Sequence, residues 1–312
     1  MKQINQFITE YIIKKKLDKP IDSSGYKYHP QTKQELINNI DELLKLNIHD
    51  FNCIDTSAIT DMSKLFSTKI IKFNDIDISN WDVSNVTNMS CMFISSYYFN
   101  CDLSKWDVSK VENMSNMFNN CVAFNCDLSS WDVSKVENMS NMFNNCGAFN
   151  CDLSKWDVSN VKYMNGMFHQ CFEFNGKGLE NWDVSNVENM MSMFNSCTIF
   201  NADISNWDVS SVTDMGGIFN YCKKFNIDLS KWDVSNVKDM SYAFNYCINF
   251  KGKGLENWDV SNVTNMTSMF TDCKRLNCDL NSWDVSNVTK MYDMFNNCTL
   301  LKNKPSWYNE NI

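Results

Sequence analysis

Hydrophobic residues recur between residues 51 and 301 with a period of 25 or 26 residues. We number positions in this repeat from its tryptophan, so that position +8 lies eight residues after it. Apolar residues stand at −3, 0, +2, +5, +8, +11, +12 and +18, and most positions between them are polar. A unit this short cannot bury its apolar side chains alone, whereas units stacked like on like share one continuous core. The pattern therefore predicts a repeat solenoid of about ten coils.

The tryptophans set the register of the repeat, because each full unit begins with Trp-Asp-Val-Ser. We expect one structural ladder of stacked residues, made of Trp81, Trp106, Trp131, Trp156, Trp182, Trp207, Trp232, Trp258 and Trp283. Apolar residues at 0 and +2 alternate as in a short β-strand. Those at +5, +8 and +11 recur every third residue, which suits a 3₁₀ or irregular turn. Each coil is therefore predicted to combine a short parallel strand with such turns.

The ends of a solenoid need caps over the exposed core. Residues 1–50 are predicted to form a helical N-terminal cap, residues 51–301 the solenoid and residues 302–312 a C-terminal cap or tail. A capping box from Thr32 to Glu35 opens one helix of the N-terminal cap. An earlier helix is also predicted, with Ile4, Phe7, Ile8 and Tyr11 on one of its faces.

Two units are one residue longer than the others. The additional residue lies in Gly176-Lys177-Gly178 and in Gly252-Lys253-Gly254. Glycine tolerates positive φ, so both segments are predicted to be bulges that absorb the insertion without shifting the ladder.

Composition narrows the classes of function. The chain is 44% hydrophobic and 13% aromatic, which is too apolar for a disordered protein. Its net charge of −9 argues against nucleic-acid binding, which needs a basic surface. No segment approaches the ~20 apolar residues of a membrane span, and the N-terminus lacks a signal-peptide core. We therefore expect no membrane insertion, and an intracellular or non-classically exported protein.

Twelve of the fourteen cysteines follow the repeat, and Cys53 and Cys91 do not. Equivalent cysteines of stacked coils could form disulfides, but the absence of a signal peptide favours reduced thiols, for which two interpretations remain. Eight stand at +15 and four at −5, namely Cys121, Cys146, Cys171, Cys197, Cys222, Cys247, Cys273 and Cys298, then Cys101, Cys126, Cys151 and Cys278. They could serve a metal-binding or thiol-redox protein. Alternatively, they are small buried residues at a tight corner. No Cys-x-x-Cys pair or histidine partner has zinc-site spacing, so we favour the second interpretation and expect no cofactor.

Residues of catalytic type do not form a recognisable active site. Aspartates at +1 could form a cation-binding stripe, but turn capping is the interpretation that we favour. The three histidines, His29, His49 and His169, lie in no nucleophile or metalloprotease motif, and no glycine-rich phosphate loop is present. We therefore expect a protein that is not an enzyme.

The repeat resembles that of BspA-like leucine-rich-repeat surface proteins and of related mycoplasma surface lipoproteins. The resemblance is carried by Trp-Asp-Val-Ser-x-Val-x-x-Met-x-x-Met-Phe-x-x-Cys-x-x-Phe-Asn, as in residues 106–125. It implies a leucine-rich-repeat-like solenoid, a role in adhesion or host-protein binding, and a place at the cell surface.

Positions that vary between coils are the candidates for a binding surface. They include several tyrosines, which are common in protein interfaces. The candidate partner-binding residues are Tyr163, His169, Tyr221, Tyr242, Tyr246 and Tyr292. The leading hypothesis is a non-catalytic scaffold with an unidentified protein partner. The alternatives are a metal-binding or thiol-redox protein and a purely structural or assembly protein.

Overall fold

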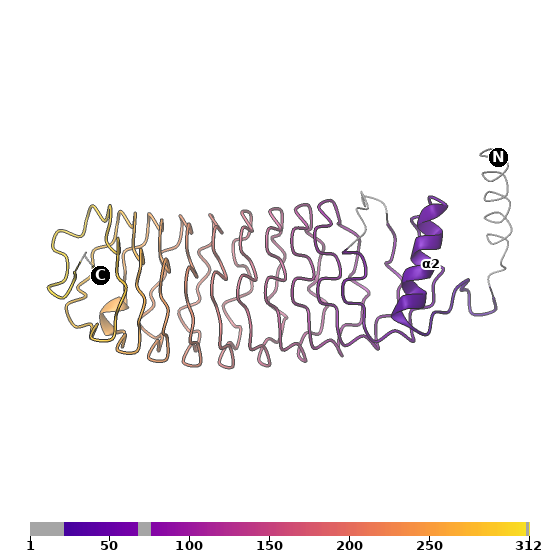
Figure 1. Ribbon diagram of the computed structural model, residues 1–312, viewed down its shortest axis with the longest axis horizontal. Coiled ribbons are helices and arrows are strands. Elements are labelled where there is room, and N and C mark those ends of the chain that lie inside the picture. The colour runs from indigo at the N-terminus through magenta and orange to yellow at the C-terminus, as the bar shows by residue number, and fades with distance from the viewer. Residues whose placement is uncertain (1–21, 68–75, 310–311) are drawn as a thin grey trace.

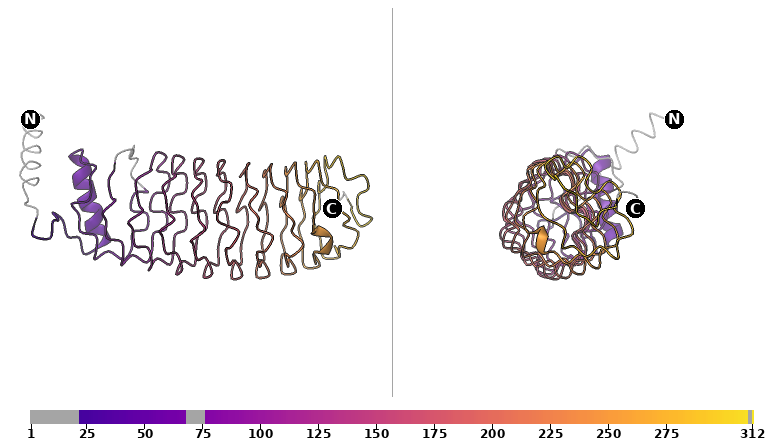
Figure 2. Two further views of the ribbon diagram at one scale, coloured as in Figure 1. Left: turned by 180° about the vertical axis from the view of Figure 1, so that it is seen from behind. Right: turned by 90° about the vertical axis from the view of Figure 1, so that its left-hand side faces the viewer.

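The chain winds into a rod of stacked coils, with one repeat in each coil (Figure 1). The structure is a computed structural model and describes residues 22–67, 76–309 and 312. The end-on view shows successive coils superposed around one axis (Figure 2). The repeat solenoid predicted from the hydrophobic period is therefore confirmed. The predicted helical face at Ile4, Phe7, Ile8 and Tyr11 lies outside the described residues.

Regular secondary structure is scarce in the described ranges. They contain the α-helix α2 (Lys33–Lys45) and the 3₁₀ helix η1 (Leu255–Asn257). Neither is long and apolar enough to cross a membrane. Instead of β-strands, the described coils share isolated parallel bridges at position +7, from Asp61↔Asn88 to Asn265↔Lys290.

The strand predicted at the tryptophan and valine of each unit is therefore wrong. The aspartate at +1 accepts a hydrogen bond from the main-chain N–H at +3, as Asp107 Oδ1 does from Ser109 at 3.1 Å. The N–H of Val111 then closes a turn onto the carbonyl of Val108 at 2.9 Å. Such local bonds compete with a β ladder for the same backbone groups, and here they prevail.

Turns continue along positions +8 to +15, and they explain the three-residue spacing. The N–H of Met117 donates to the carbonyl of Met114, three residues earlier. Residues at +10 and +14 have positive φ in every full coil, as Asn116 and Asn120 do at 56° and 63°. Each of them is the third residue of a turn, where a type II turn requires positive φ. The i→i+3 bonds of the predicted irregular turns are present, but as successive β-turns.

Alternate N–H groups of these turns hold one coil to the next. The N–H groups of Met114, Asn116, Phe118 and Asn120 donate to carbonyls of the following coil at 2.8–3.0 Å. The main chain is thus satisfied between coils without strands.

The core consists of aromatic stacks that run along the rod. The phenylalanines at +12 are spaced 5.5–5.8 Å between ring centroids in neighbouring full coils. Each indole from Trp106 onward donates its Nε1–H to the carbonyl at −3 of the preceding coil, as Trp131 does to Leu103 at 3.0 Å. The nine ladder tryptophans are at most 5% exposed. Stacking and indole hydrogen bonds together fix the register of the coils.

The two insertions form the bulges expected from their glycines. Gly178 and Gly254 have φ of 93° and 94°. Their neighbours Lys177 and Lys253 reach Asp152 and Asp228 of the preceding coil at 2.8 and 2.7 Å.

Helix α2 packs at the N-terminal end of the rod (Figure 1). Its capping box at Thr32 and Glu35 is formed as predicted, and it buries Leu36, Ile40 and Leu43. At the other end, Trp307 stacks on Trp283 with centroids 6.1 Å apart.

Candidate functional site

The cysteine ladder at +15 is part of the framework. All fourteen thiols are free. Each of the eight at +15 donates to the carbonyl at +12 of the preceding coil, with Sγ–O distances of 2.9–3.1 Å. In the described ranges, no three histidine, cysteine or acidic side chains converge as a metal site would require. The interpretation as small buried residues at a corner is the one that these contacts support.

Thiol chemistry should follow this burial. Burial raises the pKa of every +15 thiol, and raises that of Cys298 to about 12. Only the thiolate is a nucleophile, so these eight should not react with an aromatic disulfide reagent at pH 8. At most the other six should react in the folded protein, and all fourteen after unfolding in urea. Rapid reaction of more than six native thiols would contradict the structure.

The aspartates at +1 cap turns. Hydrogen bonds from the serine at +3 lower the pKa of Asp107, Asp132 and Asp208. These carboxylates therefore already accept from the main chain, which favours capping over a cation-binding stripe.

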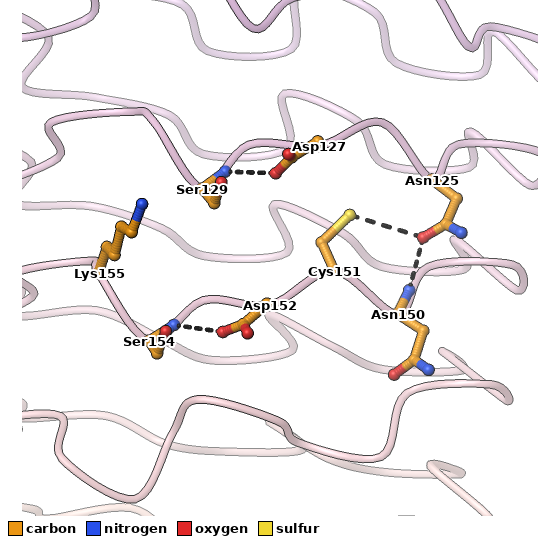
Figure 3. Close-up of a pocket in the computed structure, with 8 residues that line it drawn as sticks. All are labelled: Asn125, Asp127, Ser129, Asn150, Cys151, Asp152, Ser154 and Lys155. Carbon is orange, nitrogen blue, oxygen red and sulfur yellow. Dashed lines mark hydrogen bonds between the residues drawn. The ribbon is translucent and has the colours of Figure 1, made fainter.

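A hollow between coils is built from the same capping elements (Figure 3). It measures about 400 Å³ and lies between two coils. Asn125 Oδ1 accepts the N–H of Asn150, and Asp127 and Asp152 accept those of Ser129 and Ser154. Its side-chain acceptors hold the turns and the neighbouring coils that form it, so these contacts assign it a structural role.

The candidate partner-binding residues lie in the turn segment from +7 to +14. We call the side chains at +7, +9, +10, +13 and +14 the turn face. Tyr163, Tyr221, Tyr242 and Tyr292 are exposed on it, with 39–61% of each residue accessible. They come from four coils, and the structure does not join them into one cluster.

Two of the predicted residues do meet. The rings of Tyr221 and Tyr246 stack at 4.4 Å between centroids, with an angle of 7° between their planes. Tyr246 is half-buried. His169 is half-buried as well, and burial lowers its pKa. Its Nδ1 lies 3.5 Å from Asn144 Nδ2 of the preceding coil.

A second hollow lies on the turn face. It measures about 220 Å³, and its lining includes Met191, Gly216, Gly217 and Tyr242. Gly216 stands at +9, where the other full coils have side chains, and Gly217 at +10, where Gly166 is the one other glycine of the full coils. A Cβ on Gly217 would lie 3.2 Å from Ser192 Oγ and 3.8 Å from Asn220 Cβ. The missing side chains therefore create the space.

Two carboxylates line this hollow. Asp214 and Asp239 occupy position +7 of adjacent coils and are joined by a parallel bridge. Burial, with a smaller contribution from the charge of Asp239, raises the pKa of Asp214. Within the described ranges neither carboxylate has an ion-pair partner. Asn220 Oδ1, on another wall, is buried without a hydrogen-bond partner.

Sequence reasoning missed this hollow, although the aligned repeats contain its signal. Asp214 and Asp239 are the one pair of adjacent aspartates in the +7 column of the full coils, and Gly216-Gly217 is the one Gly-Gly pair of the sequence. Comparing the residues at each repeat position for adjacent like charges and for glycines finds the aspartate pair and the glycine pair.

The raised pKa of Asp214 makes a prediction about stability. Ionisation of this carboxyl is disfavoured in the folded state, so the charged carboxylate opposes folding at pH 7. This destabilisation disappears as the pH falls through the folded-state pKa of Asp214. Asp214→Asn keeps the turn-capping oxygen, because asparagine caps the same turn at Asn189 and Asn265. We expect the variant to be more stable than the parent at pH 7, with a gap that narrows toward about pH 4. Urea unfolding across that range measures the gap, and a gap that widened on acidification would refute the assignment.

Comparisons with known proteins place the chain in a family. Of the curated proteins, none matches. A solved structure titled "Crystal structure of TLR13-ssRNA13 complex" aligns at 11% identity with a TM-score of 0.22, over 86% of this chain and 48% of that one. The chain thus spans about half of that protein, and a likeness so slight supports no conclusion about this one. The resemblance to BspA-like proteins stays a prediction.

The family model described as "Mycoplasma protein of unknown function, DUF285" matches four overlapping segments, residues 34–156, 102–178, 138–253 and 227–312. Together they extend from residue 34 to the last residue and include every full repeat. The chain belongs to this family.

Proposed function

We propose that the protein is a non-catalytic scaffold that binds another protein through its turn face. The observation that carries this proposal is that one set of side chains in the repeat builds the coils and another set faces the solvent. The indole Nε1–H groups, the +15 thiols and the +1 carboxylates are engaged in contacts that build the coils. Tyr163, Tyr221, Tyr242 and Tyr292, at positions that differ from coil to coil, are exposed to solvent.

Unusual backbone positions support the same face. Tyr221, Tyr242 and Tyr246 have φ of 56–60°, where other full coils place asparagine, serine, glycine, glutamine, aspartate or, at Cys91, cysteine. A bulky side chain in this region is strained, and strain of this kind concentrates at functional sites. Aromatic residues held there at a cost in stability are consistent with selection for binding.

The adhesion role implied by the BspA-like resemblance belongs to this proposal, with a host or cell-surface protein as the partner. The net charge of −9 favours a protein over a nucleic acid.

A triple variant tests the face without disturbing the coils. Tyr221→Asn, Tyr242→Ser and Tyr292→Ser each introduce a residue that other coils carry at the same position. Immobilised parent and variant are incubated with a labelled surface-protein extract of candidate host cells, and captured proteins are quantified by mass spectrometry. We expect a defined set to be captured by the parent and reduced at least about tenfold by the variant, as for loss of interface aromatic residues.

A matched control changes exposed aromatic residues elsewhere. Tyr97 and Phe172 stand at +16, outside the turn face, and are 54% and 44% exposed. Threonine occupies +16 at Thr198 and Thr299, so Tyr97→Thr with Phe172→Thr should fold normally. Equal capture by parent and turn-face variant, or loss in the control alone, would count against the proposal.

A further inference from the structure

The first coil shows how this repeat binds an ammonium group. Lys33 of α2 donates from Nζ to Asp61 Oδ2 at 3.2 Å and to Ser63 Oγ at 2.7 Å. This coil has no tryptophan, but Asp61 forms a parallel bridge with Asn88 at +7 of the next coil, so Asp61 and Ser63 stand at +7 and +9. Asp61 Oδ1 accepts the N–H of Ser63 at 2.7 Å, which holds the carboxylate in place. The turn face therefore already binds a lysine within the chain.

The same pair recurs in the hollow on the turn face. Asp239 and Ser241 occupy +7 and +9 of the coil that begins at Trp232. Asp239 Oδ1 accepts the N–H of Ser241 at 2.7 Å, as Asp61 does from Ser63. Asp239 Oδ2 also accepts Asn265 Nδ2 at 2.9 Å, which leaves lone pairs of the carboxylate for a further donor. Asp214 stands beside it in the preceding coil.

The charge of this site is not balanced within the described part of the chain. Asp61 has Lys33 within 3.2 Å, whereas Asp214 and Asp239 have no ion-pair partner there. The pKa of Asp61 is lowered, since the hydrogen bonds from Ser63 and Lys33 outweigh its burial. The pKa of Asp214 is raised by burial and by Asp239. A cation placed between these carboxylates would favour the ionised form of Asp214, which burial and the charge of Asp239 now disfavour.

The shape of the hollow suits a long side chain with a compact charged end. Gly216 and Gly217 leave room next to the carboxylates. Met191 and Tyr242 border the same space and are 43% and 45% exposed, so they offer apolar surface to an aliphatic stem.

We propose that the Gly216–Gly217 hollow binds the ammonium group of a lysine presented by the partner protein, between Asp214 and Asp239, as Asp61 and Ser63 bind Lys33. This inference rests on the proposed protein-binding function and names the chemistry of its partner. Lysine fits better than arginine because the internal example offers separate point acceptors rather than a fork that matches a planar guanidinium.

Nuclear magnetic resonance with short peptides tests the site directly. The amide signals of Gly216 and Gly217 are followed while acetyl-Gly-Lys-Gly-amide is added, in parallel with its Nε-acetylated form and its arginine counterpart. We expect saturable shifts with the lysine peptide, none with the acetylated peptide, and weaker binding by the arginine peptide. Asp239→Asn should weaken lysine binding by about tenfold or more, as for loss of a charge-assisted hydrogen bond.

Two further variants separate binding from folding. Gly217→Asn fills the hollow with the residue that stands at +10 in Asn116 and Asn141, so it should abolish the shifts while the protein stays folded. Cys91→Asn also introduces asparagine at +10, but in a distant coil, and it should have no effect on binding. Asp127→Asn, at a turn outside this hollow, is the control for charge.

The outcomes distinguish this inference from the proposed function. Shifts that are equal for lysine and acetyl-lysine, that persist in Asp239→Asn, or that are strongest with arginine would overturn it. Capture of partners by the turn face would be unaffected by that result. Conversely, lysine binding together with no difference in capture between parent and tyrosine variant would contradict the proposed function alone.

Discussion

Replacing Phe168 by alanine is expected to lower the free energy of unfolding by about 3–5 kcal/mol. Phe168 is fully buried and lies 5.8 Å, centroid to centroid, from Phe143 and from Phe194 in the coils on either side. It also stacks on Phe174 of its own coil at 4.1 Å. Alanine would interrupt the stack in the middle of the rod, where no end can rearrange to fill the cavity. Urea unfolding followed by tryptophan fluorescence measures the loss.

Phe172→Ala provides the comparison, because Phe172 lies four residues away and is 44% exposed. Its removal should change stability by no more than about 0.5 kcal/mol. In a solenoid each coil contacts only its neighbours, so Phe168→Ala should expose the adjacent coils first. Hydrogen exchange that increased equally along the whole rod would contradict that expectation.

Gly254→Ala is expected to destabilise the protein by at least about 2 kcal/mol. The residue has a φ of 94°, and an added Cβ would lie 2.2 Å from the backbone nitrogen of Ser230 and 2.6 Å from its Cα. Both are main-chain atoms of the preceding coil, so the contact cannot be relieved by a side-chain rotation. Either the bulge or the stacking of the two coils must change. The midpoint of urea unfolding reports the loss.

Gly147→Ala is the matched glycine variant. An added Cβ at Gly147 would lie 3.6 Å from Phe172 Cδ2, which is ordinary van der Waals contact, and its φ is not in the left-handed region. This variant should be neutral or slightly stabilised, because alanine restricts the unfolded chain. If Gly254→Ala were equally well tolerated, the close approach of the bulge to Ser230 would be wrong.

The sequence was most informative where one side-chain role repeats in every coil. The tryptophan ladder, the buried cysteines and the glycine bulges followed from the period, because a stacked repeat puts equal positions next to each other. The capping box of Thr32 and Glu35 was equally local and therefore predictable. In contrast, alternation of Trp106 and Val108 indicated a strand, and the structure has a turn there. Alternation of apolar residues indicates which side chains are buried. It contains no information on the hydrogen bond that the Asp107 carboxylate accepts from a backbone N–H.

The candidate site was likewise predictable only in part. Tyr163, Tyr221, Tyr242 and Tyr292 were identified as variable residues, and all are exposed on the turn face. Their arrangement was not predictable, since Tyr221 meets Tyr246 across a coil boundary while Tyr163 and Tyr292 lie in other coils.

The sequence by itself determined that this protein is a solenoid, which residues fill its core and where its register absorbs an insertion. These properties depend on hydrophobic burial and on the repeat period, both of which are written in the order of the residues. Only the tertiary structure decided that the coils are joined by turns and isolated bridges. It also decided that Asp214 and Asp239 share a hollow without an ion-pair partner in the described ranges, while Asp61 is paired with Lys33. The hydrogen bonds and charges that join one coil to the next come from groups about one repeat apart, as Met114 and Asn138 are, and those groups meet only when the coils stack.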